Sequence, residues 1–436
     1  GGWGMTIWQK RFGVAFGKNL FLANCKRPEL VLDGEGTHAY NQCIYEDTER
    51  EIMSRIHVES GLDRIDTVNS LLKGRRIGLM TNPTGVTHDL TSGIDLIHAR
   101  YDLRALLSCE HGIRGDAQAG ADVATYVDPE TGVTVYSTYS AKNQRLDEEM
   151  LAAFDVLVFD MQDVGARFYT YLYSLSYAME SCAKAGKTFI VLDRINPIGG
   201  VKRCGTLLDR RFSSFVGDYE LPTQYGLTIG EYARYVKAYL HLDLDLHVVA
   251  LSGWKRELYL DDTDLPWVAP SPNCATLQAA LCYIGTCVFE GTNLSEGRGT
   301  TLPFEMIGAP WVNGVELEKR MNALALPGVH FRRTAFTPTF SKHAGELCIG
   351  VQVHITQRDT FNAFNSGLLL LDTIRSLHPD QFEFVSWEPN EPPAVWKLMG
   401  TDEYTKGTFS AQEIIDKYAP QVAAFGEHTI EYQLYS

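Results

Sequence analysis

The chain has 436 residues, enough for two ordinary domains with a large hydrophobic core. Hydrophobic residues make up 45% and charged residues 21%, a globular composition that excludes a disordered or coiled-coil chain. The net charge of −15 disfavours a nucleic-acid surface, because phosphate binding needs clustered Lys and Arg. No apolar run approaches the ~20 residues of a membrane span. The nine cysteines include no C-x-x-C pair, which argues against a disulfide scaffold and a zinc knuckle.

The first sixty residues differ in pattern from the rest of the chain, and we predict that residues 1–60 form an extension outside the fold. Lys10-Arg11 and the apolar stretch after it resemble a secretion signal, but Gly17-Lys18-Asn19 interrupts that stretch. Met53 offers an alternative start of the chain, which we prefer to a functional leader.

A regular alternation of strands and helices begins at Gly61. The predicted strands are 76–81, 103–108, 156–160, 188–192 and 247–251, and the predicted helices are 90–99, 147–153, 171–185 and 228–240. This order predicts right-handed crossovers and a parallel, Rossmann-like sheet over residues 61–262. Within residues 123–139, the turn-forming residues 128–132 predict a hairpin insertion. No G-x-G-x-x-G follows the first strand, so we expect no dinucleotide. No P-loop or G-x-S-x-G is present either, and we expect no cofactor.

A proline-rich segment, residues 266–273, marks a junction. Beyond it, strand-like runs at 284–289, 330–336 and 347–355 mix with helices at 314–324 and 360–377. We therefore predict a second, smaller α+β domain over residues 263–436. Cys274, Cys282 and Cys287 in this region are expected to be buried thiols.

Charged and polar residues follow three predicted strands of the first domain. They are Glu110, His111 and Arg114 after the second strand, Asp160, Gln162, Asp163, Arg167 and Tyr169 after the third, and Asp193, Arg194 and Asn196 after the fourth. The carboxyl ends of parallel strands meet at one edge of a sheet, so we expect these groups to share one crevice. The alternative interpretation is a set of structural ion pairs, in which Arg167 and Arg194 neutralise Asp163 and Asp193.

The segment Glu290 to Thr301 contains three glycines and many polar groups. This composition favours a loop that lines a ligand-binding site over a segment of the hydrophobic core. The candidate binding residues of this loop are Glu290, Asn293, Glu296 and Arg298. This mixture suits sugar hydroxyls and a carboxylate, to which Arg298 could offer a bidentate fork. The aromatic residues Phe168, Tyr169, Tyr171, Trp267 and Trp311 could stack on sugar rings, although any single one is more often a packing residue.

Four motifs in order resemble a known family. They are Glu110-His111-Gly112-Ile113-Arg114-Gly115, Asp160 to Tyr171, Asp193-Arg194-Ile195-Asn196-Pro197 and Glu290 to Thr300, joined by Ser271-Pro272-Asn273. From about Gly61 to the C-terminus the chain resembles the exo-β-N-acetylmuramidases of the NamZ type. The resemblance implies a Rossmann-like domain joined to a smaller α+β domain with the active cleft between them. It also implies release of N-acetylmuramic acid from the non-reducing end of peptidoglycan fragments, with Glu110 matching the family's proposed catalytic glutamate.

Glycosidases usually pair a protonated acid with a second carboxylate that acts as base or nucleophile. We assign Glu110 as the acid, with His111 or Asp160 tuning it. The second group stays open among Asp163, Asp193, Glu290 and Glu296, and the substrate's N-acetyl group could replace it. Arg114, Arg167 or Arg298 would hold the lactyl carboxylate that distinguishes muramic acid from glucosamine.

Two other functions remain as alternatives. A non-catalytic binding protein for cell-wall saccharides would use the same cleft. A metal-dependent hydrolase is less favoured, because His111 lacks an H-x-H or H-E-x-x-H companion, and we predict no metal site. The expected partner is a small saccharide, without nucleic acid or a membrane span. The resemblance implies a periplasmic or secreted enzyme, whereas a start at Met53 would imply a cytoplasmic one.

Overall fold

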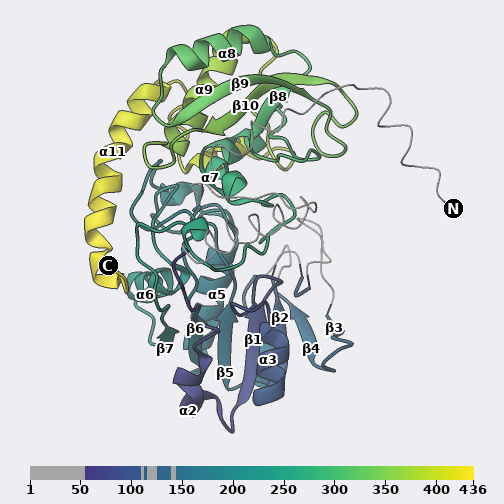
Figure 1. The fold of residues 1–436 in the computed structure, drawn as a ribbon, viewed down its shortest axis with the longest axis vertical. Helices are drawn as coiled ribbons and strands as arrows, with labels where there is room; N and C mark the ends of the chain where they lie inside the picture. The colour runs from purple at the N-terminus through teal and green to yellow at the C-terminus, as the bar shows by residue number, and fades with distance from the viewer. Residues whose placement is uncertain (1–54, 110–111, 115–124, 139–143) are drawn as a thin grey trace, which may run out of the picture. The chain divides into compact units, whose positions relative to one another are not determined.

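The computed structural model describes residues 55–109, 112–114, 125–138 and 144–436. Residues 55–436 form one compact unit. Figure 1 shows its two sheets, a large one built from the first half of the sequence and a small one built from the second half.

The large sheet has seven strands in the order β3-β4-β2-β1-β5-β6-β7. Its strands are β1 (Arg76–Thr81), β2 (Asp102–Ser108), β3 (Tyr126–Val127), β4 (Thr134–Ser137), β5 (Val156–Asp160), β6 (Thr188–Leu192) and β7 (Asp245–Val249). All neighbouring pairs are parallel except β3 with β4, an antiparallel hairpin at the edge. The chain leaves β1 toward β2 and leaves β5 toward β6, so the order reverses between β1 and β5. In open α/β sheets, ligands bind beside such a reversal point.

Helices cover both faces of this sheet. They are α2 (Asn69–Leu72), α3 (Gly93–Arg100), α4 (Glu148–Ala153), α5 (Tyr171–Lys184) and α6 (Ile229–Tyr239). On one face, Ile94 and Ile97 of α3 pack with sheet residues such as Leu79. On the other face, the residues of α5 and α6 belong to a core that continues into the second half of the chain. The boundary predicted at residues 262/263 stays a prediction, since the two halves share this core.

The small sheet is antiparallel, in the order β8-β10-β9. The elements of this half are α7 (Leu277–Thr286), β8 (Met306–Ala309), α8 (Gly314–Ala323), β9 (Val329–Phe336), β10 (Cys348–Ile355), α9 (Ala363–Leu377), α10 (Ala394–Met399) and α11 (Ala411–His428). Short 3-10 helices lie at 65–68, 210–212, 260–262, 287–291 and 430–432. The predicted fold class, a Rossmann-like parallel-sheet domain with a smaller α+β domain, is confirmed.

One predicted strand is wrong. Residues 284–289 lie in α7 and in the 3-10 helix Cys287–Gly291, not in a strand. Thr276 caps the N-terminus of helix α7, where its side chain accepts a hydrogen bond from the backbone of Ala279. Helix α7 packs against α9 so closely that a Cβ on Gly285 would lie 1.9 Å from the carbonyl oxygen of Ala363. When a helix is buried on most sides, its sequence does not show polar residues recurring every 3.6 positions. Such a sequence cannot be distinguished from that of a buried strand.

Both ends of the described chain are tied to the large-sheet half. Residues 55–60, predicted as part of the extension, pair with the segment around Thr263, and Val58 is fully buried. At the other end, α11 (yellow in Figure 1) runs from the small-sheet half to α6, where Phe425 meets Tyr235 with ring centroids 5.8 Å apart. Helix α11 therefore connects the two halves.

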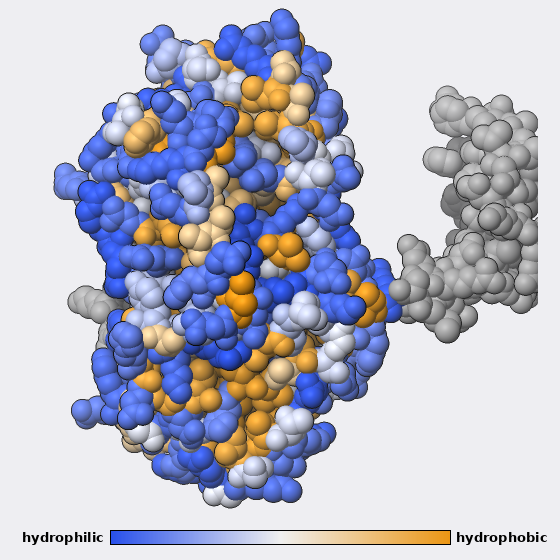
Figure 2. Space-filling model, turned by 90° about the vertical axis from the view of Figure 1, so that its left-hand side faces the viewer, coloured by the Kyte–Doolittle hydropathy of each residue, from blue (hydrophilic) through white to orange (hydrophobic). Residues whose placement is uncertain are grey.

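The face in Figure 2 is mostly hydrophilic, with hydrophobic residues in separate patches. Within the described part of the chain, no helix combines the length and apolar character that crossing a bilayer requires.

Candidate active site

A pocket of about 120 Å³ lies between the segment that follows β5 and the first helices of the second half. It is lined by Phe168, Tyr169, Thr170, Tyr171, Val216, Ser271, Asn273, Cys274, Tyr283, Cys287, Glu290, Arg298, Phe304 and Leu398. Among the described residues, Glu290 is the only carboxylate and Arg298 the only guanidinium in this wall.

Glu290 and Arg298 come from the predicted ligand loop. Glu290 lies near the end of the 3-10 helix that extends α7, and Gly297 and Gly299, both at positive φ, turn the chain on either side of Arg298. Arg298 Nη2 lies 2.7 Å from Glu290 Oε1, and Arg298 Nε lies 3.4 Å from Glu296 Oε1. Burial raises the pKa of Glu290, whereas Arg298 opposes the rise.

Glu296 is the deeper of the two glutamates. Its side chain is 2% exposed, against 21% for Glu290, and it pairs with Lys342 Nζ at 2.8 Å. The four charged groups Glu290, Glu296, Arg298 and Lys342 sum to zero, so protonation of Glu290 would leave a net positive charge at the pocket wall.

The rest of the pocket is aromatic. Tyr169 and Tyr171 meet edge to face with centroids 4.8 Å apart, and Tyr283 meets Phe304 at 4.6 Å. The guanidinium of Arg298 lies over the Phe304 ring, 5.1 Å from its centroid. Of the predicted stacking residues, Phe168, Tyr169 and Tyr171 line this pocket, and Trp267 lines another. Trp311 packs against His378 instead, with ring centroids 5.4 Å apart.

A second, smaller pocket lies over the ends of β1, β5 and β6, where the strand order reverses. Thr84, Thr87, Gln162, Arg194 and Trp267 are among its lining residues. The Gln162 side chain donates hydrogen bonds to the carbonyl oxygens of Asp163 (2.7 Å) and Ile195 (2.8 Å), so its amide nitrogen is engaged in joining loops.

Asp160 and Arg194 form a buried, two-point ion pair. Arg194 Nε lies 2.6 Å from Asp160 Oδ1, and Nη2 lies 2.9 Å from Oδ2. Arg194 therefore pairs with Asp160 and not with Asp193. The pair joins the ends of β5 and β6, which are neighbours in the sheet.

Asp193 and Asn196 hold neighbouring segments of the chain together through hydrogen bonds. Asp193 accepts hydrogen bonds from the backbone of Arg194 and Gly230 and from the hydroxyls of Thr228 and Tyr435, and it is fully buried. It thereby fixes the start of α6 and the C-terminal tail. Asn196 is also buried, and its side-chain nitrogen donates to the carbonyl oxygen of Leu227 at 3.0 Å.

Asp163 is buried without a basic partner among the described side chains. Its Oδ2 accepts hydrogen bonds from Tyr225 and from the backbone of Gly165 (2.6 Å). Burial raises its pKa to about 6. The alternative interpretation, an ion pair between Asp163 and Arg167, is wrong.

Arg167 and Arg114 do not line the pocket, and both bind other parts of the chain. Arg167 is fully buried and donates to the carbonyl oxygens of Thr206, Leu221 and Leu398, the last two at 2.8 Å. Arg114 contacts Asp128 and Glu130 in and beside the hairpin turn, with Nη2 3.0 Å from an oxygen of each. Of the three arginines considered for the lactyl carboxylate, only Arg298 lines the pocket.

Three predicted site residues remain. Glu110 and His111 lie outside the described residues. Asn293 lies in the ligand loop, but its side chain bonds the backbone of Gln381 (2.7 Å) and Glu383 (3.1 Å) and does not line the pocket.

The sequence did not single out Ser271, Asn273, Tyr283 and Phe304 as site residues, although all four line the pocket. The motif Ser271-Pro272-Asn273 could have indicated the first two, since Pro beside small polar residues is typical of an ordered loop. Tyr283 belongs to the helix whose last turn was predicted as a strand. The three cysteines Cys274, Cys282 and Cys287 are buried and free, as predicted.

Comparisons with known proteins agree with this architecture. Residues 77–278 match the model of the N-terminal part of exo-β-N-acetylmuramidase NamZ, and residues 281–435 match the model of its C-terminal part. The chain is 45% identical, over 396 residues, to the peptidoglycan β-N-acetylmuramidase NamZ of Bacillus subtilis (strain 168). This alignment covers 89% of the chain and 94% of the relative.

Two solved structures of DUF1343 family proteins from Bacteroides fragilis NCTC 9343 share the fold. The first has a TM-score of 0.80 and 35% identity, covering 88% of this chain and 100% of the other. The second has a TM-score of 0.68 and 28% identity, covering 87% and 99%. With both family models matched and this identity over most of its length, the chain belongs to the NamZ exo-β-N-acetylmuramidase family.

Proposed function

We propose that this chain is an exo-acting glycoside hydrolase that releases β-linked N-acetylmuramic acid from the non-reducing end of peptidoglycan fragments. The observation that carries the proposal is the 45% identity to a peptidoglycan β-N-acetylmuramidase over 94% of that enzyme's length. The pocket supports it independently, because aromatic rings beside one carboxylate and one guanidinium suit a sugar that bears an acidic substituent.

In the proposed mechanism, Glu110 donates a proton to the leaving glycosidic oxygen, in the role that the family motif implies. Glu290 is our choice for the second group, because it is the pocket carboxylate with 21% exposure, whereas Glu296 at 2% is committed to Lys342. Near the sugar, Glu290 could serve as base or nucleophile, or it could orient an N-acetyl group that attacks from within the substrate.

Arg298 is proposed to bind the lactyl carboxylate. Its guanidinium lines the pocket and is 23% exposed, so a ligand can reach it. Ionised Glu290 takes one N–H of the Arg298 Nη2 group, at 2.7 Å, and the other N–H groups of the guanidinium are proposed to bind the lactyl carboxylate.

The test is hydrolysis of a chromogenic N-acetylmuramide beside the matching N-acetylglucosaminide. The wild-type chain should release product from the muramide and discriminate against the glucosaminide. Glu110→Gln should remove most of the activity, whereas Glu130→Gln, at a glutamate that is 61% exposed and pairs with Arg114, should leave it unchanged. Saccharide binding without any product on prolonged incubation would instead indicate the non-catalytic binding protein.

A further inference from the structure

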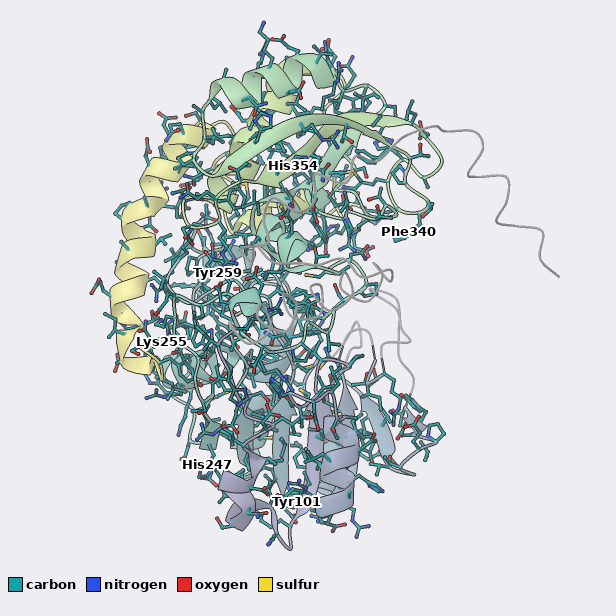
Figure 3. The ribbon with its side chains drawn as sticks, in the orientation of Figure 1. Tyr101, His247, Lys255, Tyr259, Phe340 and His354 are labelled. Atoms are coloured by element: carbon teal, nitrogen blue, oxygen red, sulfur yellow. The ribbon has the colours of Figure 1, made fainter. Side chains whose placement is uncertain are left out.

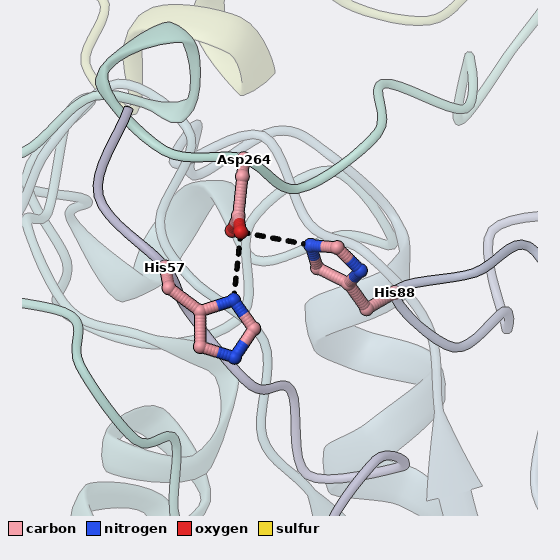
Figure 4. A group of neighbouring side chains, drawn as sticks. All are labelled: His57, His88 and Asp264. Atoms are coloured by element: carbon pink, nitrogen blue, oxygen red, sulfur yellow. Dashed lines mark hydrogen bonds and ion pairs between the residues drawn. The ribbon is translucent and has the colours of Figure 1, made fainter. Parts of the chain in front are cut away.

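His57, His88 and Asp264 meet in space although 31 and 176 residues separate them along the chain (88 − 57 and 264 − 88). Figure 4 shows both imidazoles directed at the carboxylate. His57 Nδ1 lies 2.7 Å from Asp264 Oδ2, and His88 Nε2 lies 3.0 Å from the same oxygen. The two nitrogens and the oxygen lie within 4.8 Å of one another. None of these residues belongs to the proposed reaction.

Backbone hydrogen bonds hold the three residues in place. The second oxygen of Asp264 accepts from the backbone of Val58 at 3.0 Å, and its own backbone nitrogen donates to Ile56 at 3.0 Å. The backbone nitrogen of His88 donates to Asp63 Oδ1 at 2.7 Å. Hydrogen bonds between these loop segments therefore pre-organise the cluster, which is what a binding site requires.

The cluster is open to solution and lies in a negative environment. The exposed fractions of the side chains are 67% for His57, 36% for His88 and 22% for Asp264, and because the Nε2 atom of His88 is itself buried, an ion would enter from the side of His57. Glu59 and Asp63 add Coulomb attraction for positive charge at His57. A cation at this place would be favoured by three carboxylates.

We propose that His57, His88 and Asp264 form a binding site for a divalent transition-metal cation, with Zn²⁺ as the best fit. Two imidazole nitrogens and one carboxylate oxygen, with water in the fourth position, are a donor set that Zn²⁺ accepts. The hydrogen bond from Val58 to the other Asp264 oxygen is the kind of outer-shell contact that orients a ligating carboxylate.

The geometry is compatible with a metal after small movements. Zn²⁺ bonds of about 2.0–2.2 Å in a tetrahedron place ligand atoms about 3.4 Å apart. The two nitrogen–oxygen separations of 2.7 and 3.0 Å would open by about half an ångström, through side-chain rotation. The ion would then connect the first described segment, the loop after β1 and the segment after residue 262, which are otherwise joined by hydrogen bonds.

The test uses the full-length chain, freed of metal with a chelator and titrated with ZnCl₂ by calorimetry at about pH 7.5, roughly one unit above the ordinary imidazole pKa of about 6.5. His57→Ala and His88→Ala should each weaken Zn²⁺ binding at least about tenfold, the lower range for loss of even an outer-shell group. His247→Ala is the matched control, because His247, labelled in Figure 3, lies on the edge strand β7. Its Nε2 lies 2.9 Å from Asp245 Oδ1, so it is a histidine beside one aspartate.

Thermal unfolding gives a second readout that does not depend on activity. Zn²⁺ should raise the Tm of the wild-type chain and of His247→Ala, because a ligand that binds only the folded state stabilises it, but should not raise that of His57→Ala. His57 is mostly exposed, so this variant should fold even if His88→Ala does not. No Zn²⁺ binding, or equal binding by all variants, would overturn the proposal and leave Asp264 as the acceptor for two histidines.

Discussion

Arg298 Nη2 lies 2.7 Å from Glu290 Oε1 at the wall of the pocket, and the same guanidinium reaches toward Glu296 on its inner side. One arginine therefore joins a glutamate that a substrate can touch to one that it cannot. The difference in exposure, 21% against 2%, separates two residues that the sequence presents as equivalent.

The first prediction concerns the second catalytic group. Glu290→Gln should lower kcat by about 10²–10⁴-fold, the usual contribution of a positioned acid or base, with the chromogenic muramide as substrate. Glu305→Gln is the control, because Glu305 is a buried glutamate of the same half of the chain that accepts a hydrogen bond from Gln278 and does not line the pocket. Equal activity of Glu290→Gln and wild type would remove Glu290 from the mechanism.

The second prediction concerns recognition of the lactyl group. Arg298→Lys keeps the charge but removes the two-pronged donor, so inhibition by free N-acetylmuramic acid should weaken by at least about tenfold, as expected for a charge-assisted bond worth about 1.5–3 kcal/mol. Inhibition by N-acetylglucosamine should change little, because it lacks the carboxylate. If inhibition by both sugars weakens equally, Arg298 maintains the shape of the pocket and does not recognise the lactyl group.

The third prediction tests the buried pair of Asp160 and Arg194. Arg194→Met leaves a buried carboxylate without its partner and should lower the free energy of unfolding by about 3–5 kcal/mol in urea denaturation. The double variant Asp160→Leu/Arg194→Met should recover much of the loss, since the uncompensated charge is gone. Arg76→Met, at a pair with Asp155 whose side chains are 45% and 38% exposed, should have a much smaller effect. A loss as large for Arg76→Met would contradict this reasoning.

The fourth prediction concerns the pH dependence of stability. Burial raises the pKa of Asp193 to about 7, above the ordinary value of 3.8, so between these values the folded state binds more protons than the unfolded state. The free energy of unfolding should therefore fall as pH rises from about 4 to about 7, by up to about 4 kcal/mol for this one group. Above about pH 7, the contribution of Asp193 to the free energy of unfolding should be constant.

The measurement is urea unfolding at several pH values for the wild type and for Asp193→Asn. The variant cannot ionise at this position, so its stability relative to the wild type should increase as pH rises toward 7. Asp155→Asn is the opposite control: Arg76 holds the pKa of Asp155 down at about 2, so its contribution is lost only in strong acid. Parallel pH profiles for the wild type and Asp193→Asn would refute the role given to Asp193.

The sequence by itself determined the alternation of strands and helices that makes the large sheet. Apolar runs such as 156–160 are bounded by turn residues, and this local signal does not depend on the rest of the chain. The sequence also indicated the ligand loop, because Glu290, Arg298 and their glycines are close together in the chain. Its prediction failed at α7, where close packing against α9 buries the helix on most sides and removes the polarity pattern.

Tertiary structure alone decided which polar residues share a site and which are anchors. Asp193, Arg194 and Asn196 follow one strand with the same local pattern, but their roles depend on partners from α6, β5 and the C-terminal tail. His57, His88 and Asp264 give no spacing signal at all, because a motif records neighbours along the chain, whereas a site is built from neighbours in space. Burial and partnership are set only when distant segments pack, and they decide whether a charged side chain serves the fold or meets a ligand.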